Sequence, residues 1–168
     1  MIKTKKTIFQ LALMLVAAIA SAQNNTNYWQ QEVDYTMTID VNAKEHQYQG
    51  EQTLVYTNNS QDTLTKAFYH LYFNAFQPGS QMDVRSRTIK DPDSRVGDRI
   101  NKLSKDEIGY IRVNELLQNG SAVDYEVVGT VLEVDLAQPI LPGKSATFDM
   151  KFNAQVPLQI RRSGRDNK

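Results

Sequence analysis

Cysteine is absent from this 168-residue chain, and histidine nearly so. Without cysteine there is no disulfide, no thiol nucleophile and no cysteine to carry a lipid anchor. The only histidines, His46 and His70, are far apart in sequence, and neither is followed by the glutamate of an HExxH motif. Zinc needs several converging nitrogen, sulfur or carboxylate ligands, so we expect no metal site in this chain.

Other catalytic patterns are missing too. There is no G-x-S-x-G elbow, and the glycines are isolated turn residues that cannot cradle a phosphate. Asp91 with Asp93, and Glu133 with Asp135, are pairs of carboxylates, but the second pair has the outward parity of a strand. The segment around Asp91 lacks the residue order of a calcium loop. We therefore predict no catalytic, cofactor-binding or metal-binding residues.

Neither sign of charge is in excess, since 19 basic residues balance 19 acidic ones. A nucleic-acid partner would be attracted by a strongly basic surface, which this composition does not offer. We expect no nucleic acid among the partners.

Residues 1–22 have the pattern of a secretory signal peptide. Three lysines form a basic start, Ile8–Ala20 is apolar apart from one glutamine, and a small-x-small triplet ends at Ala22. The apolar stretch is too short to span roughly 30 Å of hydrocarbon. We expect cleavage before Gln23, export to the periplasm or beyond the cell, and no stable membrane anchor afterwards.

Short segments of alternating apolar and polar residues recur after residue 32. Val33–Asn42 and Ala146–Ala154 alternate without a break, and Tyr48–Tyr56 ends in an apolar run. Further strands are expected at 111–113, 123–127 and 132–136. Asn119-Gly120 is a strong hairpin signal. The pattern predicts an all-β, mostly antiparallel β-sandwich of seven or more strands.

The segment 64–76 is the most aromatic, because five of the fifteen aromatic residues lie within Phe68–Phe76. Its spacing fits a helix as well as a strand, but the aromatic enrichment and the Gln77–Ser80 turn favour a strand. We predict a central strand that is buried on both faces, with His70 packed among its neighbours. One face would fill the core, and a neighbouring layer or another domain would cover the other.

Residues 77–109 break the alternating pattern, since charged residues dominate and apolar ones are sparse. We predict one long charged excursion with two short helical turns, including a capping box at Ser104 and Glu107. An insertion of this length is either a functional or interaction loop or a solvated flap. The sequence leaves both possibilities open.

The chain is thus predicted to contain a leader at 23–32 and one sandwich domain at 33–157. The basic, unpatterned segment 158–168 is interpreted as a linker that is truncated before a further domain.

Two long segments carry a resemblance to a known family. They are YTMTIDVNAKEHQYQGEQTLVYTNNSQDTLTKAFYHLYFNAF at 35–76 and VLEVDLAQPILPGKSATFDMKFNAQVP at 131–157. The first contains a G-x-x-x-L-x-Y-x-N-x-S pattern, and the second contains an L-x-x-P-x-x-P-G-x-S turn. Together they resemble the N-terminal β-sandwich domain of secreted bacterial zinc metallopeptidases of the aminopeptidase N type, over roughly Tyr28–Arg162.

The resemblance implies that a thermolysin-like catalytic domain follows the sandwich. That domain would hold the zinc, the HExxH helix and the substrate loop, none of which occurs here. By this resemblance the chain alone is no enzyme, while the full-length parent is a zinc-dependent aminopeptidase. Its partners would be its own catalytic domain and, through that domain, peptides.

A second interpretation is a secreted binding module that recognises carbohydrate or protein. Its basis would be the 77–109 excursion or the exposed aromatics at Tyr28-Trp29, which include the only tryptophan. A packing role at the domain edge explains Trp29 better than a carbohydrate platform does.

Overall fold

The structure is a computed structural model that describes residues 28–89, 96–160 and 162–166. The chain divides into two units, Met1–Gln30 and Gln31–Lys168, and the fold described below belongs to the second. The expected signal peptide and the carboxylate pair Asp91 and Asp93 lie outside the described residues. No described helix is long and apolar enough to cross a membrane.

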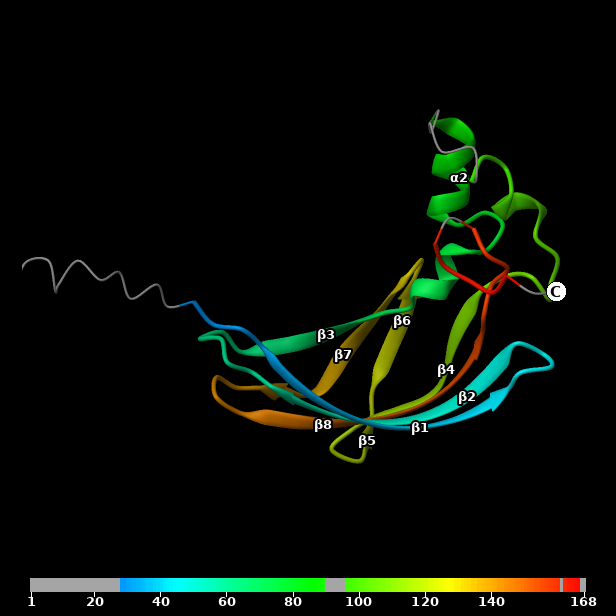
Figure 1. The fold of residues 1–168 in the computed structure, drawn as a ribbon. Helices are drawn as coiled ribbons and strands as arrows, with labels where there is room; N and C mark the ends of the chain where they lie inside the picture. The colour runs from blue at the N-terminus through cyan, green and yellow to red at the C-terminus, as the bar shows by residue number, and fades with distance from the viewer. Residues whose placement is uncertain (1–27, 90–95, 161, 167–168) are drawn as a thin grey trace, which may run out of the picture. The chain divides into compact units, whose positions relative to one another are not determined.

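Two antiparallel sheets form the sandwich predicted from the alternating pattern (Figure 1). The larger sheet has the order β1-β2-β8-β4-β5, and the smaller has the order β3-β7-β6. The strands are β1 (Glu32–Asn42), β2 (Gln47–Thr57), β3 (Leu64–His70), β4 (Tyr110–Gln118), β5 (Ser121–Ala122), β6 (Asp124–Val128), β7 (Val131–Ile140) and β8 (Ser145–Gln155). The helical segments are η1 (Tyr72–Ala75), α2 (Gln81–Thr88) and η2 (Ile100–Lys102).

The three longest alternating segments form the strands predicted for them. β1 pairs with β2, and β2 pairs with β8, each along its whole length without a register shift. The predicted hairpin at Asn119-Gly120 joins β4 to β5. Both turn residues have positive φ, 49° and 79°, as a two-residue turn between twisted strands requires.

The main core lies between the two sheets. Its largest fully buried members are Phe148 on β8 and Leu132 and Val134 on β7. Phe148 meets Tyr69 of β3 edge to face, with 6.3 Å between the ring centroids. Gly50 on β2 is required here, because a Cβ at this position would overlap the ring of Phe152.

Our prediction for 64–76 was wrong in two respects. The strand ends at His70, and Tyr72–Ala75 forms a 3₁₀ turn. Asn74 stabilises this turn, because its side chain accepts a hydrogen bond from the Ile111 N–H at 2.8 Å. β3 is also an edge strand of its sheet, and Phe68 shares the outward parity of Lys66, so that Phe68 is 61% exposed and Tyr72, in the turn that follows, is 66% exposed.

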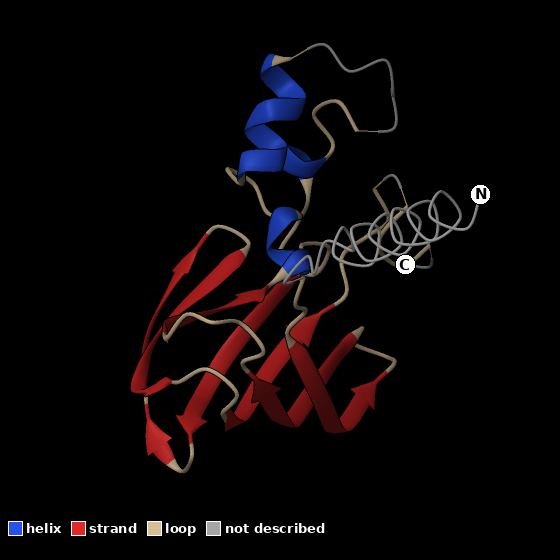
Figure 2. Cartoon of the chain, turned by 90° about the vertical axis from the view of Figure 1, so that its left-hand side faces the viewer, coloured by secondary structure: helices blue, strands red, loops and turns tan. Residues whose placement is uncertain are grey.

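The charged excursion contains the two helical pieces predicted for it, α2 and η2. Ser80 caps α2, since its Oγ accepts a hydrogen bond from the Asp83 N–H at 3.1 Å. Ser104 and Glu107 form the capping contact over a single turn, since the Ser104 backbone N–H donates to the Glu107 carboxylate at 3.0 Å and the Ser104 hydroxyl donates to it at 2.8 Å. The helices lie beyond one end of the strands (Figure 2).

A second apolar cluster holds the excursion in place. Phe76, Val96 and Ile100 pack around Ile160, which is fully buried. The described part of the segment interpreted as a linker is therefore folded back onto the excursion. Bridges between Leu158 and Arg165, and between Ile160 and Ser163, fix this return.

Replacing Ile160 with alanine should lower the free energy of unfolding by about 2–5 kcal/mol, because a fully buried aliphatic side chain is removed. The matched change Ile89→Ala removes a side chain that is 55% exposed and should alter it by less than about 0.5 kcal/mol. Urea unfolding followed by circular dichroism measures both. Equal effects would show that the cluster around Ile160 does not stabilise the domain.

Candidate functional site

An apolar groove with a volume of about 510 Å³ lies between the two sheets. It lies along β1 and β2 on one side and β3 on the other. Its lining consists of Val33, Tyr35, Met37, Gln52, Leu54, Tyr56, Leu64, Ala67, Phe68, Tyr69, His70, Tyr72, Ile140 and Phe148. None of these side chains carries a full charge except His70 when it is protonated, so the groove suits an apolar occupant.

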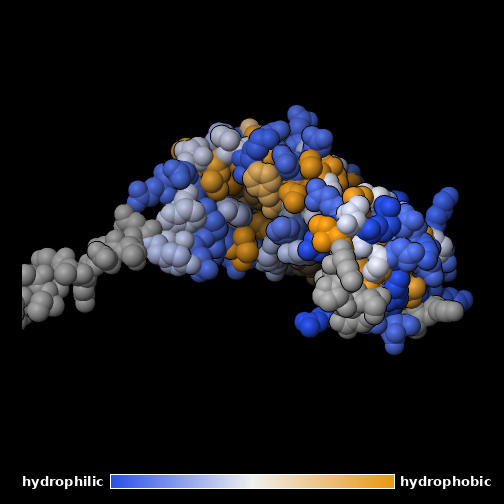
Figure 3. Space-filling view, turned by 90° about the horizontal axis from the view of Figure 1, so that it is seen from above, coloured by the Kyte–Doolittle hydropathy of each residue, from blue (hydrophilic) through white to orange (hydrophobic). Residues whose placement is uncertain are grey.

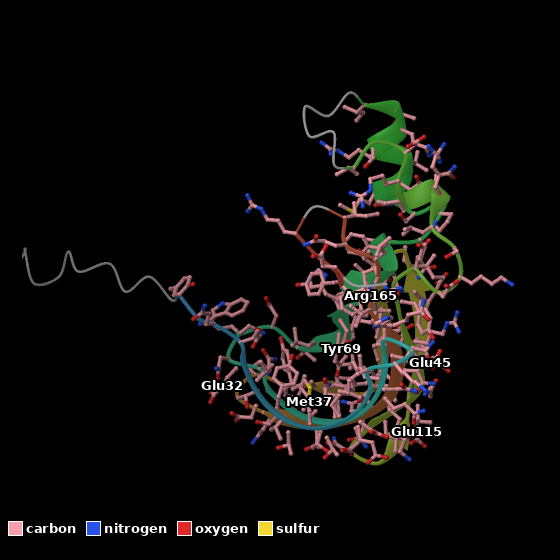
Figure 4. The ribbon with its side chains drawn as sticks, turned by 45° about the vertical axis from the view of Figure 1, so that its right-hand side comes forward. Glu32, Met37, Glu45, Tyr69, Glu115 and Arg165 are labelled. Carbon is pink, nitrogen blue, oxygen red and sulfur yellow. The ribbon has the colours of Figure 1, made fainter. Side chains whose placement is uncertain are left out.

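One wall of the groove comes from the inward row of β1. Val33, Tyr35 and Met37 line it, and the row continues along the strand with Ile39 and Val41. All five side chains are between 40% and 64% exposed. Figure 4 shows Met37 and Tyr69 on the inner side of their strands. A complete apolar row that stays exposed marks a surface that another element can cover.

The opposite wall includes the exposed aromatic residues of β3 and η1. Phe68 and Tyr72 both line the groove, and the imidazole of His70 stacks on the ring of Tyr72 at 5.0 Å and 14°. Seen from above, apolar side chains gather between polar ones on this face (Figure 3). The structure thus places His70 in an aromatic stack rather than beside a nucleophile or a metal ligand.

Two polar atoms are buried in the groove without a hydrogen-bond partner among the described residues. They are Nε2 of Gln52, whose residue is 8% exposed, and the hydroxyl of Tyr69. Leaving such a group unpaired costs about 1–3 kcal/mol.

Burial raises the pKa of Tyr69, and the neighbouring Tyr35 raises it further. Because the phenolate would have to form in an apolar place, the hydroxyl stays protonated and acts as a neutral hydrogen-bond donor. Tyr69 is therefore not available as a general base at neutral pH.

The structure does not bring the other sequence candidates together into a site. His46 lies in the β1–β2 turn with φ of 55°, whereas His70 ends β3. Glu133 and Asp135 flank Lys66 across the outer face of the smaller sheet, at 3.9 and 3.1 Å. The hydrogen bond and the charge of Asp135 raise the pKa of Lys66, as in an ordinary surface ion pair.

The part of the chain that the structure describes also contains no candidate metal site. No three His, Cys, Asp or Glu side chains there are grouped so that they could hold an ion.

The groove was not predicted from the sequence, although one residue of β2 indicated it. Gln52 occupies the inward parity of β2, between Gly50 and Leu54. A lone polar residue on the buried face of a strand indicates either a hydrogen-bond network or a binding site. Tyr69 gave no such signal, since its burial depends on the pairing of β3.

Neither a protein-family model nor a curated protein sequence matches the chain. The solved structures that overlap with it include M1 zinc metallopeptidases. The enzyme from Deinococcus radiodurans is 17% identical, with a TM-score of 0.48 over 76% of this chain. A two-domain M1 zinc metallopeptidase variant bound to L-tryptophan is 16% identical, with a TM-score of 0.48 over 78%.

The chain spans about a fifth of the length of these proteins, 21% and 22% respectively. Sequence identities and TM-scores this low show only that the backbones overlap in part. They carry no information on the chemistry of this chain.

Tyr69→Phe should leave the free energy of unfolding at neutral pH unchanged or raise it, because the lost hydroxyl has no partner. The matched change Tyr125→Phe removes a hydrogen bond from the hydroxyl to the Val113 carbonyl, 3.3 Å long, and should lower it by about 0.5–1.5 kcal/mol. Denaturant unfolding compares the two. A larger loss for Tyr69→Phe would mean that this hydroxyl is hydrogen-bonded after all.

The raised pKa of Tyr69 also predicts a dependence on alkaline pH. Above pH ~10 the unfolded chain releases this proton while the folded protein keeps it, so stability that is complete below pH ~10 falls as the pH rises. Relative to wild type, Tyr69→Phe should gain about 1 kcal/mol by pH 11. Unfolding curves at pH 8, 10 and 11 measure this, and a constant difference would contradict the burial of the hydroxyl.

Proposed function

We propose that this chain is the non-catalytic N-terminal domain of an exported, zinc-dependent aminopeptidase-like metallopeptidase. The sandwich packs against a catalytic domain outside this chain and helps to wall its active site. The zinc and the residues that cleave peptides belong to that catalytic domain. Export to the periplasm or beyond the cell follows from the pattern of residues 1–22.

The observation that carries the proposal is the uncovered aromatic surface at the end of the first family-like segment. Phe68 and Tyr72 expose most of their side chains, and both border an apolar groove. In an isolated domain such a patch promotes association, whereas covering one aromatic side chain contributes about 1.5–3 kcal/mol. A catalytic domain seated here would remove this surface from water.

The two segments that carry the sequence resemblance also meet in space, through Asn58. This fully buried side chain belongs to the first segment, and its amide donates hydrogen bonds to the carbonyls of Asp62 at 2.7 Å and Ile140 at 2.9 Å. Ile140 lies in the L-x-x-P-x-x-P-G turn of the second segment. The backbone N–H of Gly143, at the end of that turn, donates to the Asn58 carbonyl at 2.7 Å.

Asn58 of the first pattern and Gly143 of the second therefore act together, because their hydrogen bonds connect the end of β2 to the β7–β8 turn. Each motif can form this connection only when the other is present. Their occurrence together, in the order found in the family they resemble, supports the resemblance. The support concerns the sandwich domain and extends to a catalytic domain only through the family likeness.

The proposal is tested by comparing this chain with the longer polypeptide expected to contain it. The coding sequence beyond Lys168 should encode HExxH and a later glutamate. The longer product should cleave an aminoacyl 4-nitroanilide and lose this activity when zinc is chelated. The present chain should be inactive with and without zinc.

Variants of the aromatic surface test the docking. In the longer product, Phe68→Ser should lower the thermal unfolding temperature and kcat/KM, because it weakens the proposed interface between the sandwich and the catalytic domain beside the active site. Val127→Ser changes a side chain on β6 that is 47% exposed and should alter neither. Metal-dependent cleavage by the present chain alone, or a different domain beyond Lys168, would refute the proposal.

A further inference from the structure

The free edge of β1 is a long, unprotected strand edge. β1 pairs only with β2 among the described residues, so the backbone groups along its other side have no strand partner. Natural edge strands are protected by lysine, proline, bulges or short length. Glu32–Asn42 contains no lysine, proline or glycine, runs for 11 residues, and pairs with β2 without a bulge.

The side chains of β1 present two different chemistries to an added strand. The inward row is apolar and exposed from Val33 to Val41, and its first half lines the groove. The outward row carries the acidic residues Glu32, Asp34 and Asp40 and no basic residue. None of these carboxylates forms an ion pair with a residue that the structure describes.

The acidic character extends to the neighbouring strand. Glu51 of β2 stands on the same outward face, opposite Thr38 of β1 on one side and opposite Lys151 of β8 on the other. Directly opposed unlike charges stabilise a strand pair, whereas like charges destabilise it. The edge therefore favours a strand whose outward side chains are lysine or arginine.

The same charges disfavour a second copy of this chain. If two β1 strands paired antiparallel along their whole length, the pairing would be centred on Met37 and would place Asp34 opposite Asp40 of the other copy twice. A small apolar molecule is disfavoured for a different reason. It could fill the groove, but it would leave Ile39, Val41 and the backbone of the edge exposed.

We propose that the free edge of β1 binds an extended segment of a separate polypeptide, in which apolar residues alternate with lysine, arginine or other polar residues. The segment adds as a sixth strand to the larger sheet. Its apolar side chains extend the inward row of β1, and its basic side chains face Asp34 and Asp40.

The inference does not depend on the proposed catalytic domain, because it concerns only the edge of β1.

Binding can be measured on the purified chain with a blocked nine-residue peptide in which valine alternates with lysine. Two comparison peptides have lysine replaced by glutamate, or the same composition in an order that groups the valines. By isothermal titration, the lysine peptide should bind at least tenfold more tightly than either. Its binding should weaken as salt is added.

Two sets of variants locate the site. Met37→Lys places a charge in the inward row and should weaken binding at least tenfold. Its control, Val127→Lys, alters a side chain of equal exposure on β6 and should leave binding unchanged. The double change Asp34→Lys with Asp40→Lys alters only outward side chains and should reverse the preference, so that the glutamate peptide binds more tightly.

Amide hydrogen exchange adds a structural readout, since alternate amides of β1 should become protected when the lysine peptide binds. The inference is overturned if no peptide binds, or if the lysine and glutamate peptides bind equally. It is also overturned if Val127→Lys weakens binding as much as Met37→Lys, or if the chain forms a dimer that Met37→Lys dissociates and the peptide does not.

Discussion

The packing of β8 against β7 is the interaction on which the rest of this domain depends. β8 is the middle strand of the larger sheet and β7 is the middle strand of the smaller one. Phe148 from β8 and Leu132 from β7 are almost completely buried, and the other core residues surround them. Because burial of apolar surface is the main favourable term in folding, this contact places both sheets. It also leaves their outer strands, β1 and β3, less covered.

Both proposals start from the same feature of the fold, which is that the side chains of β1 and β3 are only partly covered. A sheet closed on all sides would hide the inward row of β1, but here Val33–Val41 stay exposed beside a groove with two unpaired polar atoms. The aromatic surface at Phe68 and Tyr72 borders the same groove. A covering domain at β3 and an added strand at β1 are separate ways of removing apolar surface from water, and the outward charges of β1 concern only the second.

Prediction from sequence succeeded where a strand has one buried face. The alternation of Ala146–Ala154 identified β8, and Asn119-Gly120 identified the β4–β5 hairpin, because both are local patterns. It failed at 64–76, where both parities are apolar. There, the end of the strand depends on a hydrogen bond from Ile111 to Asn74, 37 residues away, which no local pattern contains. Ile160 was missed for the same reason, since its burial requires the excursion to fold over it.

By itself, the sequence determined that the chain is an antiparallel β-sandwich and that the familiar catalytic motifs are missing, since periodicity and residue type are local properties. Only the tertiary structure decided which apolar rows are buried and which stay exposed. Strand order places β1 at a sheet edge, so that Met37 reaches solvent while Leu132, equally apolar, does not. The position of a strand within its sheet depends on contacts between residues that are distant in sequence, and an alternating pattern is the same at the centre and at the edge.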